Sequence, residues 1–286
     1  MYVFLRFPNF KSKALTFSYD DGSYYDEKLI SIMKEYGLKG TFNLDSGMFG
    51  NEGLKRMTKE KAYEVFAESG HEIATHGEYH QGLTELDRGM VTREILADRE
   101  QLEEMFDRRV YGLAYAHGAY NDSVVEIAKN CGIRYARTTD QTKHFGLPTD
   151  WLRWKPTCHH ANADMEKLIE AFLGTYTDWY YWFDAPKLFY IWGHSKEFEV
   201  QNNWHIFENI AQKLGNREDV WYATNGEIYE YVQAFNRLEF SVSGKLIYNP
   251  TDKDVYLHYY GKDVLVPAGQ TVRAEADKRL IVPQKK

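Results

Sequence analysis

The sequence predicts an α/β fold, and three observations support this prediction. Short apolar runs alternate with amphipathic segments from about residue 14 to residue 236. About seven such alternations predict parallel strands joined by crossover helices, in a sheet that is either closed as a barrel or left open. After residue 237, short β-branched or alternating runs replace this pattern. The chain has 286 residues, enough for one large domain or for a medium domain and a small one.

The strands and helices follow from local periodicity. Residues 14–19 (ALTFSY) form the first apolar run, and in residues 26–37 Leu29, Ile30 and Met33 recur at helical spacing. Further along, Thr84 and Asp87 have the spacing of a capping box. The other expected strands are 40–44, 71–75, 110–115, 133–137, 187–192 and 220–224, and the other expected helices are 59–70, 84–106, 122–132, 164–174, 203–214 and 226–236.

The last fifty residues predict a second, smaller unit. Segments 238–250, 254–260, 263–267 and 271–276 are separated by Gly, Pro, Asn and Asp, as in antiparallel strands joined by turns. This part of the chain holds no cluster of catalytic residue types, so we expect it to pack against the barrel, with a ligand-binding role as the alternative. We therefore divide the chain into a (β/α) unit, residues 1–236, and a small antiparallel β extension, residues 237–286.

Composition and charge exclude several classes of protein. The formal charge is −7 and no Lys/Arg-rich run is present, which argues against nucleic acid as a partner. Cys131 and Cys158 cannot form a disulfide framework or a zinc finger. No segment resembles a signal peptide or a membrane span, so we expect a cytoplasmic protein with no membrane partner, and the oligomeric state stays open. The 22 Tyr and 7 Trp are typical of carbohydrate sites, although many tyrosines simply pack at layer edges.

Polar side chains gather where the predicted parallel strands end. In a (β/α) architecture, the carboxyl ends of the strands share one face, and catalytic groups collect there. An Asp-Gly pair at a strand end is also typical of an ordinary turn, so Asp20 and Asp21 alone do not indicate a site. Polar groups at the ends of several strands do. The groups are Asp20 and Asp21 after residues 14–19, His76 and His80 after 71–75, residues 116–118 after 110–115, and His194 after 187–192.

The spacing of the histidines predicts a metal site. His76 and His80 are four residues apart, so that both imidazoles can reach one ion if the chain turns helically between them. One carboxylate, Asp21, completes a set that leaves positions open for water and substrate. Asp20 is then free to act as general base on the attacking water. His194 is a candidate general acid, with a hydrogen-bonded core histidine as the alternative.

The same residues resemble the motifs of polysaccharide deacetylases of the NodB-homology type, carbohydrate esterase family 4, over about residues 12–236. TFSYDDG (16–22) resembles T-F-D-D-G with two residues inserted, and HGEYH (76–80) resembles H-[ST]-x-x-H. IWGH (191–194) and TDWLRW (149–154) stand in the places of the fifth and fourth motifs.

The resemblance implies a distorted (β/α) barrel of seven or eight strands. It also implies a divalent metal, most often Zn²⁺, although related enzymes accept other divalent ions. The roles implied are Asp21, His76 and His80 as metal ligands, Asp20 as base and His194 as acid.

The third motif departs from the family pattern R-x-P-[FY]-G. The chain has AYAHG at 114–118, with Ala114 in the Arg position and His117 in the aromatic position. The family Arg tethers the catalytic base, and Arg153 is a candidate to replace it from another strand. The backbone N–H of His117 can still donate to an oxyanion. Its side chain could contact substrate or be a solvated turn residue.

Several residues near the fourth motif are candidates for contact with substrate or with catalytic groups. The resemblance implies that Asp150 orients His194 and that Trp151 or Trp154 stacks on a sugar ring. Residues 155–160 end in two histidines. If this stretch is a strand, alternation directs His159 and His160 to opposite sides, and at most one of them, such as His160, faces the site. The alternative is packing and surface exposure.

The expected activity is metal-dependent removal of an acetyl group, with N-acetyl on an amino sugar of an oligosaccharide or glycoconjugate as the main hypothesis. The substrate partner is then an acetylated carbohydrate. Three alternatives remain: a sugar O-acetyl esterase, a hydrolase of a non-peptide C–N bond in a small molecule, and a non-catalytic carbohydrate-binding protein. The intact Asp-Asp and His-His pairs argue against the last of these.

Overall fold

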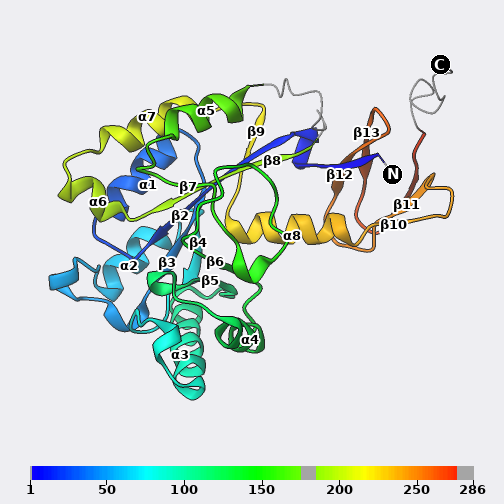
Figure 1. Ribbon diagram of the computed structural model, residues 1–286. Coiled ribbons are helices and arrows are strands. Elements are labelled where there is room, and N and C mark those ends of the chain that lie inside the picture. Colours follow the sequence, from blue (N-terminus) through cyan, green and yellow to red (C-terminus); the bar gives the residue numbers. More distant parts are fainter. Residues whose placement is uncertain (1, 175–184, 276–286) are drawn as a thin grey trace.

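A curled parallel sheet forms the centre of the molecule (Figure 1). The computed structural model describes residues 2–174 and 185–275. The strands follow one another in the order β6-β5-β4-β3-β2-β8-β7, and β9 pairs with the start of β2. The eight strands are β2 (Lys13–Asp20), β3 (Gly40–Leu44), β4 (Glu72–Thr75), β5 (Gly112–Ala114), β6 (Tyr135–Arg137), β7 (Cys158–His159), β8 (Lys187–Gly193) and β9 (Val220–Tyr222).

The segment between β6 and β7 closes the sheet into a distorted barrel. Trp154 forms a parallel bridge with Arg137, and its backbone N–H donates to the carbonyl of Ala136 at 2.9 Å. A few residues later, the N–H of Thr157 donates to the carbonyl of Tyr190 in β8 at 2.8 Å. The chain therefore connects the two edges of the sheet, and the predicted fold, a distorted (β/α) barrel with a small β unit, is confirmed.

Helices cover the outside of the sheet. The predicted start of the third helix at residue 84 is wrong, because residues 83–85 form a separate 3₁₀ turn and Asp87 accepts hydrogen bonds from the N–H groups of Gly89 and Met90 as the N-cap. The α-helices are α1 (Asp26–Glu35), α2 (Lys59–Phe66), α3 (Arg88–Phe106), α4 (Asp122–Asn130), α5 (Met165–Leu173), α6 (Ser195–Val200), α7 (His205–Leu214) and α8 (Asn225–Asn236). The 3₁₀ helices are η1 (Pro8–Phe10), η2 (Ser46–Met48), η3 (Glu52–Leu54), η4 (Leu83–Glu85), η5 (Ala116–Gly118) and η6 (Trp151–Arg153). Among these described helices, none has the length and apolar character needed to cross a bilayer.

Alternation along β2 directs its side chains to two different environments. Leu15, Phe17 and Tyr19 join the large apolar cluster with the helices around the sheet. Thr16, Ser18 and Asp20 point to the opposite side, because successive strand residues face opposite ways. Because β2 lies inside the sheet, between β3 and β8, its last inward residue, Asp20, reaches the carboxyl end of the barrel while remaining only 2% exposed.

Asn225, the first residue of α8, connects three strands inside the barrel. Its Oδ1 accepts from the Thr16 hydroxyl at 3.0 Å, and its Nδ2 donates to the Tyr190 hydroxyl at 2.6 Å. Its backbone N–H donates to the Thr41 hydroxyl at 2.9 Å. Asn225 is fully buried. These hydrogen bonds therefore replace the contacts with water that Asn225 and the three hydroxyl groups cannot make.

The C-terminal unit consists of two small antiparallel sheets, which lie beyond the barrel at one end of α8 (Figure 1). Its apolar core packs against the end of α8 at Ala234 and Phe235. The strand β1, which the predicted division assigns to the first unit, pairs with β12 and so completes one of these sheets. Residues 276–286 lie outside the described part of the chain. The strands are β1 (Val3–Arg6), β10 (Glu239–Phe240), β11 (Leu246–Tyr248), β12 (Val255–Tyr259), β13 (Lys262–Val266) and β14 (Thr271–Arg273).

We expect Asn225→Ala to lower the free energy of unfolding by about 2–4 kcal/mol, because each buried group left without a partner costs about 1–3 kcal/mol. Urea titration followed by circular dichroism measures this loss. Asn236→Ala, at the exposed end of the same helix, is the matched control. A loss for Asn225→Ala no larger than for the control would show that the buried hydrogen bonds do not hold the strands together.

Candidate active site

The structure brings the predicted aspartates and histidines together at the carboxyl end of the barrel. The closest approach links His80 Nε2 and Asp21 Oδ1 at 3.5 Å. His76 Nε2 lies 3.9 Å from Asp21 Oδ1 and 3.8 Å from Asp20 Oδ2. From the other side, His194 Nε2 lies 3.8 Å from Asp20 Oδ2. Residues from β2, from the loop after β4 and from the end of β8 therefore form a single cluster.

Asp21, His76 and His80 form a set of donors that fits a metal ion. One ligand atom from each residue lies within 4.8 Å of the others. Asp21 Oδ1 is buried, and no described residue gives it a hydrogen bond. A buried carboxylate oxygen without a donor is costly unless a cation approaches it. Two imidazoles and one carboxylate are a common protein ligand set for catalytic zinc, with a position left for water or substrate.

The protonation of the histidines is compatible with metal binding. His76 Nδ1 lies 2.7 Å from the carbonyl oxygen of Ala114. Because a carbonyl only accepts, Nδ1 carries the proton and the lone pair of Nε2 faces the cluster. Burial lowers the pKa of His76, and burial, followed by the neighbouring His76, lowers the pKa of His80 to about 3. Both rings are therefore neutral near pH 7 and can act as ligands.

Basic side chains hold Asp21 ionised through its second oxygen. Asp21 Oδ2 accepts from Lys196 Nζ at 2.5 Å and pairs with Arg56 Nη1 at 2.8 Å. Burial alone would raise the pKa of Asp21, but the adjacent histidines, Arg56 and Lys196 together lower it below its ordinary value. The carboxylate thus presents Oδ1 to the histidines while Oδ2 is fixed.

Asp20 is held by different partners. Its Oδ1 accepts from Asn43 Nδ2 at 2.8 Å, and its Oδ2 forms a buried ion pair with Arg137. Burial alone would raise the pKa of Asp20, but Arg137, more than any other neighbour, lowers it overall. The two adjacent aspartates therefore have separate environments and are both ionised near neutral pH.

Arg137 stands where the missing third-motif arginine would be needed. Ala114 at the end of β5 and Arg137 at the end of β6 are direct partners in the parallel register. Arg137 therefore stands one strand along the sheet from Ala114, at the same height. The Arg153 hypothesis is wrong, because Arg153 pairs with Asp150 at 2.7 Å and with Asp122 at 2.5 Å on the surface.

Glu197 orients His194. The Nδ1–H of His194 donates to Glu197 Oε1 at 2.8 Å, which leaves Nε2 directed toward Asp20. Burial would lower the pKa of His194, but this hydrogen bond and then the nearby aspartates raise it overall. The predicted partner Asp150 does not reach His194 and instead caps η6 at Leu152. A histidine followed by glutamate three residues later on a helical turn was a signal in the sequence that could have identified Glu197.

Both histidines of the pair at 159–160 contact Glu197. Glu197 Oε2 lies 3.2 Å from His159 Nε2 and 3.1 Å from His160 Nε2. The expected alternation fails here because β7 ends at His159. His160 lies against β8 at Gly193, where an added Cβ would be 2.0 Å from His160 Nδ1.

His159, His194 and Glu197 also have the spacing of a metal site, but their hydrogen bonds argue against one. His159 Nδ1 accepts from the backbone N–H of Ala161 at 3.2 Å, so its proton is on Nε2, facing Glu197. His194 likewise directs a proton at Glu197. His159 Nε2 and His194 Nδ1 therefore carry protons directed at Glu197, which leaves no free lone pair for an ion. At Asp21, by contrast, the lone pair of His76 Nε2 faces the cluster.

Two buried carboxylates of α3 hold the loop that carries His76 and His80. Asp98 accepts from the backbone N–H of His76 at 3.2 Å and pairs with the Thr75 hydroxyl. One helical turn away, Glu94 Oε1 accepts from the backbone N–H of Tyr79 at 2.6 Å. These contacts stabilise the left-handed backbone of His80, where φ is 56°.

The remaining predicted residues lie at the rim of the site or outside it. The exposed ring of His117 is 4.5 Å from that of His80, measured between centroids. Trp154 is only 1% exposed and packs between Tyr135 and Tyr190, so it cannot stack on a sugar. Trp151 packs against Trp154. Trp192, which the sequence analysis did not single out, lies on β8 with the Arg137 guanidinium 4.5 Å from its ring centroid.

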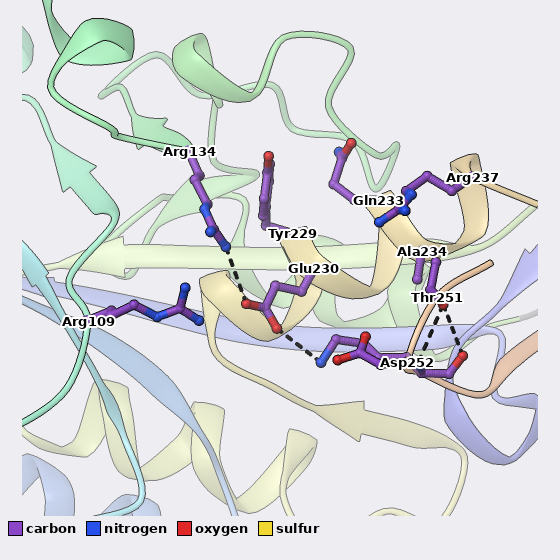
Figure 2. Close-up of a pocket in the computed structure, with 10 residues that line it drawn as sticks. Arg109, Arg134, Tyr229, Glu230, Gln233, Ala234, Arg237, Thr251 and Asp252 are labelled. Atoms are coloured by element: carbon purple, nitrogen blue, oxygen red, sulfur yellow. Dashed lines mark hydrogen bonds and ion pairs between the residues drawn. The ribbon is translucent and has the colours of Figure 1, made fainter. Parts of the chain in front are cut away.

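A cavity of about 660 Å³ lies away from this cluster, between α8 and the loops at the opposite ends of the strands (Figure 2). Arg109 and Arg134 come from the segments before β5 and β6. Glu230 pairs with Arg134 at 3.7 Å and with Lys253 at 3.0 Å. None of the predicted catalytic residues lines this cavity, so it is separate from the candidate active site.

The chain is similar to known polysaccharide deacetylases in sequence and in fold. Residues 8–136 match the family model described as polysaccharide deacetylase. YxkH of Bacillus subtilis (strain 168), provisionally named a polysaccharide deacetylase, is 25% identical over 130 residues, which are 45% of each chain. The chain spans less than half the length of the curated relatives it matches, 31% of one and 45% of another.

Two solved structures share the fold. A protein from Mycobacterium smegmatis, also provisionally named a polysaccharide deacetylase, is 16% identical with a TM-score of 0.57, over 81% of this chain and 94% of that one. A family 4 carbohydrate esterase from Streptomyces lividans in complex with acetate is 15% identical with a TM-score of 0.50, over 73% of this chain and 91% of that one.

We expect His80→Ala to lower zinc affinity by at least about 100-fold, because it removes one ligand of the site at Asp21. Competition with a chromogenic chelator measures this affinity, and elemental analysis gives the number of ions per chain. His159→Ala is the control and should retain one ion with unchanged affinity. If His159→Ala loses the ion instead, the metal binds at Glu197 and not at Asp21.

Proposed function

We propose that the chain, whose residues 8–136 match the polysaccharide deacetylase family model, is a metal-dependent hydrolase that removes N-acetyl groups from an amino sugar in an oligosaccharide or glycoconjugate. The observation that carries this proposal is the separation of two neighbouring aspartates. Asp21 turns a bare oxygen toward two neutral histidines, whereas Asp20 is bound by Arg137 and Asn43. Adjacent carboxylates in such different environments are suited to different tasks.

Asp21, His76 and His80 are the residues that would hold the ion. A zinc ion there would polarise the acetyl carbonyl and make the attacking water more acidic. Asp20 is the proposed general base, since Arg137 keeps it ionised and therefore able to take a proton from that water. Asp20 Oδ2 lies 3.8 Å from His76 Nε2 and 3.8 Å from His194 Nε2. Asp20 is therefore placed between a proposed metal ligand and the proposed general acid.

His194 is the proposed general acid. Breaking an amide requires a proton on the departing nitrogen, and the raised pKa of His194 favours the form that can give one. Glu197 fixes the ring so that Nε2 is the atom directed at the cluster. The need for this proton favours an N-acetyl substrate over the O-acetyl ester. The backbone N–H of His117, next to His80, is the proposed donor to the acetyl oxygen during attack.

Acetate release from N- and O-acetylated oligosaccharides tests the activity. We expect release from an N-acetylated oligosaccharide to stop when the protein is stripped by a chelator and to return with zinc. Asp20→Asn should retain the ion and lose about 10²- to 10⁴-fold in kcat, the usual contribution of a general base. Full turnover in Asp20→Asn would end the assignment of the base, and silence of the wild type on every acetylated sugar would end the proposed activity.

Arg137→Ala should lower kcat about 100-fold, because the unpaired base is no longer held in place. The pKa of Asp20 should also rise, since Arg137 is the group that most lowers it. The base is active when ionised, so the acid limb of the pH–rate profile should move to higher pH. Measurement of kcat from pH 4 to 9, a range of about five units, shows this shift.

The double variant Arg137→Ala with Ala114→Arg is the matched control. It returns the guanidinium to the neighbouring strand at the same height in the sheet. We expect partial recovery of kcat and a return of the acid limb toward its original position. If Arg137→Ala alone keeps both the rate and the pH profile, the ion pair does not position the base.

A further inference from the structure

The cavity of about 660 Å³ beside α8 carries an excess of positive charge (Figure 2). Four basic side chains and two carboxylates line it, although the whole chain has a formal charge of −7. Two positive charges in the cavity are therefore left without a matching negative charge. The charged residues of the lining are Arg109, Arg134, Arg237, Lys253, Glu230 and Asp252.

Two of these arginines have no counterion. Within residues 2–174 and 185–275, neither the Arg109 nor the Arg237 guanidinium forms an ion pair or a hydrogen bond. Arg109 lies between α3 and β5, whereas Arg237 directly follows α8. Figure 2 shows the two side chains on either side of Glu230. Each guanidinium has five N–H donors, so the cavity offers many hydrogen bonds to a ligand that can accept them.

The carboxylates of the cavity do not supply the missing negative charge. Glu230 Oε1 accepts from the Tyr111 hydroxyl at 3.0 Å, and Glu230 Oε2 pairs with Lys253 at 3.0 Å. Burial would raise the pKa of Glu230, but Lys253 and Tyr111 lower it overall, so this group is ionised and already bound. The side chain of Asp252 is exposed to solvent. The two unpaired arginines are thus left for an external anion.

The C-terminal unit contributes a fixed loop to the cavity. Asn249 is fully buried, and its Nδ2 donates to the carbonyls of Lys253 at 2.7 Å and Val266 at 2.9 Å. Its Oδ1 accepts from the backbone N–H of Thr251 at 3.0 Å. Residues 251–253, which line the cavity, are therefore held around one buried side chain. Because this wall is already ordered, a ligand would bind with little loss of backbone entropy.

The charge and size of the cavity indicate the chemistry of its ligand. The planar guanidinium group matches the oxygens of phosphate, to which it can donate two parallel hydrogen bonds. A phosphate monoester carries a charge of about −1.5 to −2 near neutral pH, which balances the excess of two positive charges, whereas one carboxylate balances only half of it. The volume of about 660 Å³ lies within the range of small-molecule sites.

We propose that this cavity binds a phosphoryl group, either as free phosphate or on a small organic molecule. The site is independent of the proposed deacetylase activity, because no residue of the cavity belongs to the cluster around Asp20 and Asp21. It also gives the C-terminal unit a role in binding a ligand, beyond its packing against α8.

Calorimetric titration of the full chain at low ionic strength tests the proposal. The probes are glucose 6-phosphate, glucuronate and inorganic phosphate. We expect glucose 6-phosphate to bind at least about tenfold more tightly than glucuronate, which has the same ring size but a single negative charge. Equal affinities for inorganic phosphate and glucose 6-phosphate would assign the site to free phosphate, and a higher affinity for glucose 6-phosphate would assign it to an organic phosphate. Glucose 6-phosphate that binds no more tightly than glucuronate overturns the proposal.

Variants locate the bound anion. Arg109→Gln and Arg237→Gln should each lower the affinity for glucose 6-phosphate about tenfold, the usual effect of removing a hydrogen bond to a charged group. Arg93→Gln is the matched control, because Arg93 on α3 is also exposed and has no ion pair within the described residues. His80→Ala should keep the affinity. If His80→Ala loses it and the two arginine variants do not, the anion binds at the candidate active site and the proposal is wrong.

A substitution of Glu230 gives a prediction of opposite sign. Glu230→Gln removes a negative charge from the cavity, so we expect the affinity for glucose 6-phosphate to rise about fivefold, the effect of one charge at about 4 Å in water. Glu126→Gln is the control, since Glu126 also pairs with an arginine, Arg88 at 3.2 Å, but lies outside the cavity. A gain in Glu230→Gln no larger than in Glu126→Gln would show that the ligand does not lie among these charges.

Discussion

The ion pair between Asp20 and Arg137 is the interaction on which the rest of the site depends. Both side chains are almost fully buried, at 3% and 1% exposure. Breaking such a pair leaves an uncompensated charge and costs about 3–5 kcal/mol, so the surrounding residues must keep both partners in place. Asn43 binds the second oxygen of Asp20, Trp192 supports the guanidinium, and the small side chain of Ala114 stands beside Arg137 in the neighbouring strand.

Three of the residues in the proposed site have a left-handed backbone, as do eight other non-glycine residues in the described part of the chain. Asp21, His80 and His117 have φ values of 87°, 56° and 57°, a left-handed region that residues with a Cβ seldom adopt. Each such residue costs about 1–3 kcal/mol and persists only where its surroundings determine its conformation. Around His80 the carboxylates of α3 have this role, and at Asp21 the backbone N–H donates to the carbonyl of Asn43 at 3.0 Å. Contacts with the regular elements of the barrel thus offset the free-energy cost of these left-handed residues at the strand ends.

The features that the sequence predicted depend on local patterns, whereas the arginine that it missed depends on tertiary structure. Periodicity marked the strands and helices, and the convergence of strand ends was enough to group Asp20, His76 and His194. The partners of these residues could not be found in the same way. Arg137 meets Asp20 only through the tertiary fold, from β6 to β2 and 117 residues apart in the chain. Glu197, by contrast, lies three residues after His194, a local spacing that the sequence analysis did not use. A contact between residues that are distant in the chain produces no local sequence pattern from which it could be predicted.

The position of Arg137 on β6 has a consequence for how active members of a family are recognised. A search that asks for arginine at the third motif would find Ala114 there and count this chain among inactive homologues. Arg137 nevertheless supplies a guanidinium to Asp20 from the adjoining strand. In parallel sheets, equivalent heights on neighbouring strands are interchangeable sources of a side chain. Catalytic residues are therefore better compared by their positions in the structure than by their positions in a sequence alignment. The absence of one motif residue is weak evidence that a protein has lost its activity.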